Sequence, residues 1–182
     1  GMGADVTVFD VDVARMRYID EVWGGRIGTR FSSPLAVREA CGESDVVIGS
    51  VLVPGARTPH LVDHEMVLGM VPGSVLVDVA VDQGGCFEDS HPTTHADPTF
   101  VVGGSVFYCV ANMPGAVPHT STYALTNATM RYVLLLADEG WRGACGSRDD
   151  LRRGLATCGG KLVSAPVGEA LGIECVPVSE VL

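Results

Sequence analysis

From Val6 to Val81 the sequence alternates between short β-branched runs and segments whose apolar residues recur at helical spacing. The run Val75–Val81 constrains the fold most. It carries Val at every second position together with Leu76, a pattern typical of a strand buried on both faces. Strands that alternate with helices form βαβ units with parallel pairing and right-handed crossovers. The sequence therefore predicts an α/β chain built on a parallel sheet.

Local signals divide the chain into short elements. Strands are expected at Val6–Phe9, Arg26–Arg30, Val46–Leu52, Val75–Val81, Thr99–Val102, Val106–Val110 and Glu174–Val176. Helices are expected at Ala14–Trp23, Ser33–Glu43, Asp63–Met70, Ser121–Asp138, Asp149–Ala156 and Ser164–Leu171. The dipeptide Pro54–Gly55 is typical of a turn.

A domain boundary is expected near Pro118, just before the longest helical pattern in the chain. Residues 1–118 hold the alternating strands and helices and form the first domain. Residues 119–182 hold the long helix and a tail that is too short to build a core alone. This second segment is therefore expected to pack on another part of a protein.

Composition limits the class of protein. Hydrophobic residues make up 47% of the 182 positions, which excludes a disordered chain, and no apolar run approaches the ~18 residues of a membrane span. The formal net charge is −10, and the 12 Lys and Arg residues form no basic stripe. A nucleic-acid or anionic-membrane partner is therefore not expected, and small molecules and protein partners remain.

The cysteines are spread along the chain without a CxxC pair, which argues against a zinc framework or a redox motif. They are Cys41, Cys86, Cys109, Cys145, Cys158 and Cys175. We expect reduced thiols and a cytoplasmic protein. The first residues, Gly1–Asp5, lack the charged and apolar segments of a signal peptide.

Asp82 is the first candidate site residue. It follows the buried run Val75–Val81 and precedes Gln83 and the pair Gly84–Gly85, which allows the backbone to approach a ligand closely. In open α/β sheets ligands bind at the carboxyl ends of the strands. The alternative is that Asp82 only caps a loop, and the pattern alone does not decide between the two.

Asp10 is the second candidate, at the end of the run Val6–Phe9. Dinucleotide-binding folds use a carboxylate at this position to accept hydrogen bonds from the adenosine ribose, and its charge disfavours the 2′-phosphate of NADP. NAD is the cofactor that such an acid favours. An acid that merely ends a strand is the alternative.

Other polar residues give weaker signals. His91 and His95 have the spacing of a metal pair, but no third ligand lies nearby and solvated loop histidines are the better interpretation, so no metal is predicted. Ser32 or Ser33 is expected to cap the following helix. No Gly-x-Ser-x-Gly elbow indicates a nucleophilic hydrolase.

Five separated stretches occur in order along the chain and together resemble NAD-dependent L-alanine dehydrogenases. These are Leu52–Ala56, Val77–Glu88, Pro92–Thr94, Tyr108–Gly115 and Thr120–Thr129. The resemblance covers residues 1–182 as the C-terminal portion of such an enzyme. The related transhydrogenase subunit shares the fold but not the last two stretches.

The resemblance implies reversible, NAD-dependent oxidative deamination of L-alanine to pyruvate and ammonia, in a homohexamer whose subunits have a substrate domain and a Rossmann domain. Asp82 matches a catalytic acid that assists proton transfers. Matching cofactor-binding positions are Asp10 at the ribose, Arg15 where some members have Lys, Ser32 beside the adenine, Val51 and Leu52 covering it, Val79 and Asp82 on the nicotinamide side, and Val110, Asn112 and Met113 in the loop under the nicotinamide.

Departures from the family pattern qualify these implications. The first Rossmann strand and its Gly-rich turn are expected to precede Gly1, so the isolated chain is expected to be inactive. His91 stands where an Arg is expected near the cofactor, and Leu135 and Glu139 stand where some members bind magnesium. The rival interpretations are an NAD-binding transhydrogenase-like subunit and a non-catalytic truncated remnant.

Overall fold

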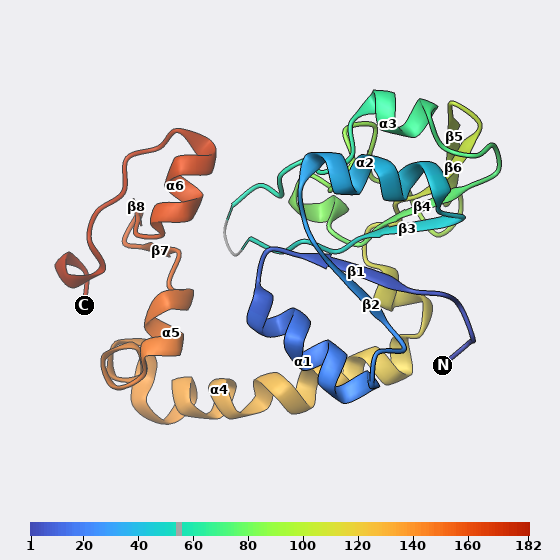
Figure 1. The fold of residues 1–182 in the computed structure, drawn as a ribbon. Coiled ribbons are helices and arrows are strands. Elements are labelled where there is room, and N and C mark those ends of the chain that lie inside the picture. The colour runs from blue at the N-terminus through green and yellow to red at the C-terminus, as the bar shows by residue number, and fades with distance from the viewer. Residues whose placement is uncertain (54–55) are drawn as a thin grey trace. The chain divides into compact units, whose positions relative to one another are not determined.

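The computed structural model describes residues 1–53 and 56–182, and the chain separates into two compact units (Figure 1). The first unit comprises residues 1–50 and 59–110, and the second comprises residues 51–58 and 111–182. The turn predicted at Pro54–Gly55 lies outside the described residues. All the parallel strand pairs belong to the first unit among the described residues.

The first unit begins with a parallel pair of strands joined by a helix. β1 (Thr7–Asp10) pairs with β2 (Gly28–Phe31), and α1 (Val13–Trp23) connects the two and packs against both. Asp12 caps the start of α1, and Gly24 ends it with a left-handed backbone, φ 58°. Each strand lies one or two residues later than predicted, and the βαβ connectivity is confirmed.

A second sheet holds four strands in the order β3-β4-β6-β5 (Figure 1). The strands β3 (Val46–Gly49), β4 (Val75–Asp78) and β6 (Ser105–Tyr108) are parallel, and β5 (Thr99–Val102) forms an antiparallel hairpin with β6. The predicted α/β class with parallel strands is confirmed.

Two capped helices connect the strands of this unit. α2 (Pro34–Glu43) starts after Ser33, whose hydroxyl accepts a backbone N–H of the first turn at 3.3 Å. α3 (His64–Leu68) starts after Asp63, whose carboxylate accepts a first-turn N–H at 2.7 Å. Ser33 rather than Ser32 is therefore the cap, and α3 is shorter than the predicted helix.

Aromatic rings run through the core of the four-stranded sheet. The ring of buried Phe107 stacks on Phe100 at 5.0 Å between centroids and meets Phe87 edge-on at 6.1 Å. The imidazole of His91 stacks on the ring of Phe100, with 3.8 Å between the ring centroids. His91 therefore has a packing partner on the surface of the core.

Two strands end earlier than their apolar runs predict. β3 ends at Gly49 instead of Leu52, at the point where the loop that follows β4 packs on it: a Cβ at Gly49 would lie 2.6 Å from the Cβ of Cys86. β4 ends at Asp78 instead of Val81, because the Asp78 carboxylate binds backbone N–H groups of the next segment and turns the chain.

The second unit is mainly helical. It contains the 3₁₀ turn η2 (Met113–Ala116), the long helix α4 (Pro118–Ser147), and α5 (Asp149–Gly154). α4 is longer than predicted and is interrupted at Gly140, where φ is 68°. In the described part of the chain, no helix combines the length and apolarity needed to cross a membrane.

The tail of the second unit differs from the prediction. A small antiparallel hairpin, β7 (Thr157–Cys158) with β8 (Lys161–Leu162), precedes α6 (Ala165–Leu171) and the turn η3 (Val178–Glu180). The strand expected at Glu174–Val176 is absent from the described residues. In that segment the N–H of Val176 donates one hydrogen bond to the carbonyl of Leu162 in β8, at 2.9 Å.

Candidate functional site

Asp78, the last residue of β4, is wholly buried and binds the loop that follows it. Its Oδ2 accepts hydrogen bonds from the N–H of Cys86 at 2.8 Å, the N–H of Phe87 at 3.4 Å and the hydroxyl of Ser90 at 2.6 Å. Its Oδ1 accepts from the N–H of Ala80 at 3.0 Å. The carboxylate therefore fixes both ends of the loop between residues 79 and 90.

Asp82 lies at the outer side of this loop, in the 3₁₀ turn η1 (Val81–Gln83). Val81 is buried beneath the turn, whereas Asp82 is exposed. The turn is closed by Gly84 and Gly85, whose φ values of 100° and 81° favour glycine. No hydrogen bond or ion pair to the Asp82 carboxylate is present among the described residues, so this acid faces solvent at the carboxyl edge of the sheet.

Ser90 links the loop to the end of β6. Its hydroxyl donates to Asp78 and accepts from the Cys109 thiol at 3.7 Å. Burial raises the pKa of Cys109, and the nearby Asp78 charge adds to this, so the thiol stays a neutral donor. Thr93 donates its N–H to the carbonyl of Cys109 at 2.9 Å and forms an isolated parallel β-bridge with Val110. Val110 is buried, so it would offer a ligand its backbone rather than its side chain.

Val79 occupies the step between β4 and η1. Its N–H donates to the carbonyl of Gly49 at 2.8 Å, and its side chain is 53% exposed. Gly49 in turn packs on Cys86 and Phe87 without room for a side chain. The ends of β3 and β4 therefore form one surface, with Val79 available to an apolar ligand group.

Asp10 and Ser32 meet at the carboxyl ends of β1 and β2. The N–H of Ser32 donates to the carbonyl of Asp10 at 2.9 Å. The Asp10 Oδ1 accepts from the N–H groups of Val11 at 2.7 Å and Asp12 at 2.9 Å. In the described part of the chain, no donor binds its Oδ2 or the Ser32 hydroxyl. Both groups are thus able to accept from a bound ligand.

Arg15 lies in the first turn of α1, close to Asp10 in sequence. Its N–H donates to the capping carboxylate of Asp12 at 3.1 Å, and its guanidinium lies over the ring of Tyr18, 5.6 Å from the centroid. The charge is exposed and directed along the helix, so it contacts neither Asp10 nor Ser32 here.

The other predicted cofactor residues belong to the second unit. The carbonyl of Val51 accepts from the hydroxyl of buried Thr58 at 3.5 Å, and Leu52 is 64% exposed. Asn112 has a left-handed backbone, φ 57°, and Met113 begins the turn η2. Among the described residues Asn112 is the one non-glycine with positive φ, a conformation that often marks functional loops.

His64 and Asp89 form an ion pair beside the same loop. The His64 Nδ1 lies 3.0 Å from the Asp89 carboxylate, and its backbone N–H donates to Glu88 at 2.9 Å. The hydrogen bond to Asp89, and then the Asp89 charge, raise the pKa of His64, with smaller contributions from Glu65 and Glu88. The pair ties the N-terminus of α3 to the loop.

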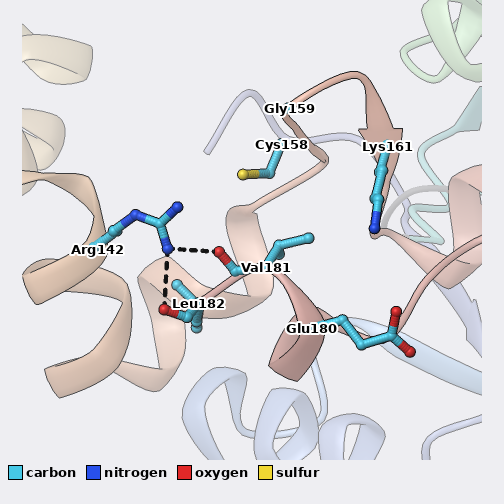
Figure 2. A pocket seen from close by; sticks show the side chains of 7 residues that line it. All are labelled: Arg142, Cys158, Gly159, Lys161, Glu180, Val181 and Leu182. Carbon is cyan, nitrogen blue, oxygen red and sulfur yellow. Dashed lines mark hydrogen bonds between the residues drawn. The ribbon is translucent and has the colours of Figure 1, made fainter.

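An open depression in the second unit contains none of the predicted site residues. Figure 2 shows Arg142 of α4 directed toward the end of the chain, where its guanidinium donates to the carbonyls of Val181 at 2.8 Å and Leu182 at 3.0 Å. The lining residues are Arg142, Cys158, Gly159, Lys161, Glu180, Val181 and Leu182. Arg142 therefore holds residues 181 and 182 by hydrogen bonds, and we assign this depression no ligand.

No group of three metal-ligating side chains occurs among residues 1–53 and 56–182. In the part of the chain that the structure describes, none of the six cysteines forms a disulfide bond.

The sequence pattern does not single out Asp78 as a site residue, because this acid lies inside an apolar run. An acid at a buried strand position is nevertheless a signal, since a carboxylate there must be hydrogen-bonded. The Gly-rich loop that follows could have indicated the source of its donors.

The parallel strand pairs, with helices between strands and acids at the strand ends, place the chain in the α/β class. Residues 1–165 match the family model "Alanine dehydrogenase/PNT, C-terminal domain". The chain belongs to this family, which confirms the resemblance.

Individual relatives agree with the family assignment. The chain is 57% identical to an alanine dehydrogenase of Mycolicibacterium smegmatis and 55% identical to one of Mycobacterium tuberculosis, over all of this chain and 49% of each relative. It therefore spans about half the length of the curated relatives that it matches.

Among solved structures, an alanine dehydrogenase again matches this chain better than a transhydrogenase does. An L-alanine dehydrogenase superposes with a TM-score of 0.80 at 46% identity, over 93% of this chain and 47% of that one. A transhydrogenase from Sinorhizobium meliloti reaches 0.61 at 28% identity, over 76% of this chain and 40% of that one.

Proposed function

We propose that this chain supplies the NAD site and a proton-transferring carboxylate for the reversible oxidation of L-alanine to pyruvate and ammonia. The observation that carries the proposal is the exposed Asp82, held at the carboxyl edge of the parallel sheet by a loop anchored at its base. The 57% identity to an alanine dehydrogenase over the entire chain supports the same reaction.

The residues at the end of β1 fit the adenosine side of NAD. The Asp10 Oδ2 and the Ser32 hydroxyl are available as acceptors next to each other, and the carboxylate charge disfavours a 2′-phosphate. The Asp10 Oδ1 is held by two backbone N–H groups, so the orientation of this acid is fixed before a ligand binds. Arg15, Val51 and Leu52 are proposed to complete this side of the site.

The residues after β4 fit the reacting side. Val79, Asp82, Val110, Asn112 and Met113 are proposed to surround the nicotinamide ring, which accepts the hydride when NAD is bound. Asp82 would take and return protons at the reacting carbon of the substrate. An exposed carboxylate can do this because it exchanges protons with water between turnovers.

The wider setting is proposed from the family. Residues 1–118 would belong to the NAD-binding domain and residues 119–182 to the substrate domain, in a cytoplasmic homohexamer. The rival function, a transhydrogenase-like NAD-binding subunit, is less well supported, because the transhydrogenase superposes at lower TM-score and identity than the L-alanine dehydrogenase.

The test uses the purified full-length product of the gene that encodes this chain. With L-alanine, NADH should accumulate at alkaline pH and pyruvate should appear in equal amount, and NADP should be used far less efficiently. Asp10→Ser should narrow the preference for NAD, whereas Asp12→Ser, which keeps a helix cap, should leave it unchanged. Absence of L-alanine-dependent NADH formation would refute the proposal.

A further inference from the structure

Asp78 is a buried acid that the proposed chemistry does not use. It has no exposed surface, and no cationic side chain binds it among the described residues, where its polar contacts are hydrogen bonds. A buried charge without a paired cation is costly and needs donors in good geometry. The chain provides four donors, all from the loop that carries Asp82.

These donors arrange three parts of the candidate site around one carboxylate. The N–H of Ala80 fixes the entry into η1, and the N–H groups of Cys86 and Phe87 fix its exit. Ser90 then connects the carboxylate to Cys109 at the end of β6. We call Asp78, Ser90 and Cys109, with the donating loop amides, the Asp78 cluster.

The space around the cluster leaves little freedom. A Cβ at Gly85 would lie 2.8 Å from the Asp78 Oδ2 and 2.9 Å from the Cβ of Ser90. At Gly85 the backbone of the loop therefore lies so close to the Asp78 carboxylate that a side chain would not fit. A shift of the loop would break the hydrogen bonds, and loss of the hydrogen bonds would release the loop.

We propose that Asp78 is a positioning residue for the reaction assigned to Asp82. The Asp78 cluster holds η1 against β4 and β6, so the exposed Asp82 carboxylate stays in one place relative to Val110 and the strand ends. This inference rests on the proposed function. Displacing a reacting group by about 1 Å can lower a rate by about 100-fold, so holding the turn is a catalytic requirement.

An aspartate is required because all four partners are donors. The carboxylate only accepts, whereas an asparagine would turn its NH₂ group toward N–H or O–H donors at one of the two oxygens. Asp78→Asn should therefore loosen the loop although it keeps the size of the side chain. Ser90→Ala is the milder variant, because it removes one donor and leaves the three amides.

The test measures turnover in the full-length gene product for Ser90→Ala, Asp82→Asn and the double variant. Ser90→Ala alone should lower kcat about threefold to tenfold with a KM for NAD changed by less than about twofold. In the Asp82→Asn background the same change should lower kcat by less than about twofold, since it acts through Asp82. Asp45→Asn, the same chemical change at an exposed acid before β3 and outside the loop, should leave kcat unchanged.

Amide hydrogen exchange gives a second readout that needs no activity. In Asp78→Asn and Ser90→Ala the amides of Cys86 and Phe87 should exchange at least about tenfold faster, while amides of β1 are unchanged. Equal effects of Ser90→Ala in both backgrounds, or unchanged exchange at Cys86 and Phe87, would overturn the inference and leave the proposed function standing. Normal turnover in Asp82→Asn would overturn the role of Asp82 and this inference with it.

Discussion

The end of β4 and the turn that follows it contain two aspartates in contrasting environments. Asp78 is buried and accepts four hydrogen bonds, whereas Asp82 is exposed and accepts none among the described residues. We propose two tasks for the same type of side chain: the buried carboxylate, held by its donors, anchors the loop, and the exposed carboxylate transfers protons. Stability and activity should separate at these two positions.

The largest effect is expected from removing the anchor. Asp78→Ala leaves four buried or half-buried donors without their acceptor and should lower the free energy of unfolding by about 3 kcal/mol or more. Asp82→Ala removes an exposed side chain and should change it by less than about 0.5 kcal/mol. Urea unfolding of both variants checks this, and equal losses at the two positions would abolish the distinction.

The next effect concerns the close approach of the loop to the anchor. Gly85→Ala adds a methyl group 2.8 Å from the Asp78 Oδ2 at a φ of 81° and should cost about 2 to 3 kcal/mol. Gly73→Ala is the matched control, since its φ is 92° but no atom lies within 4 Å of the added carbon. It should cost only about 1 kcal/mol. Similar unfolding midpoints for the two variants would show that the approach is not tight.

Ser105 provides a buried polar group that contrasts with Asp78. Its hydroxyl is wholly buried and finds no partner among the described residues. Ser105→Ala removes an unsatisfied group of nearly the same volume and should raise stability by up to about 1 kcal/mol. A clear loss of stability in thermal unfolding would mean that this hydroxyl is hydrogen-bonded in solution.

The smallest effect is the pH dependence of the His64–Asp89 pair, which is partly exposed and screened. Asp89 raises the folded-state pKa of His64 above its unfolded value. The pair therefore stabilises the fold fully below the unfolded pKa, and this contribution is lost as pH rises through the folded pKa. Unfolding followed between pH 5 and 9 should show this slope in the wild type and a weaker one in Asp89→Asn. An identical slope in both would exclude the pair as its source.

The sequence predicted the fold class and most elements because β-branched runs, helix caps and Gly-rich turns act locally. It did not predict the end of β4, because Val79 and Val81 continue the strand pattern while the hydrogen bonds that turn the chain come from Cys86, Phe87 and Ser90. Such partners depend on tertiary structure.

The sequence of the tail contains a local signal for the β7–β8 hairpin. Gly159 and Gly160 form a two-residue turn between β7 and β8, with φ values of 56° and 80°. Two glycines between short strands favour a hairpin turn with positive φ at both positions. The expected strand at Glu174–Val176 was wrong, because the N–H of Val176 makes a single backbone hydrogen bond to β8 and the segment is not part of a strand pair among the described residues.

The candidate site residues were predicted mainly from the family resemblance. The structure brings Asp10 next to Ser32, and Val79 next to the turn of Asp82, whereas Arg15 is directed along α1 toward Tyr18. Their roles toward NAD remain predictions. The positioning role that we propose for Asp78 could not be predicted from the sequence, because it depends on hydrogen bonds from residues 86, 87 and 90 that only the folded loop brings to the carboxylate.

Turnover and stability of Asp82→Asn, measured together in the full-length gene product, test the division of roles most directly. We expect kcat for L-alanine oxidation to fall at least about 100-fold, while the midpoint of unfolding stays within error of the wild type. Near-normal turnover, or a loss of stability as large as that of Asp78→Ala, would contradict it.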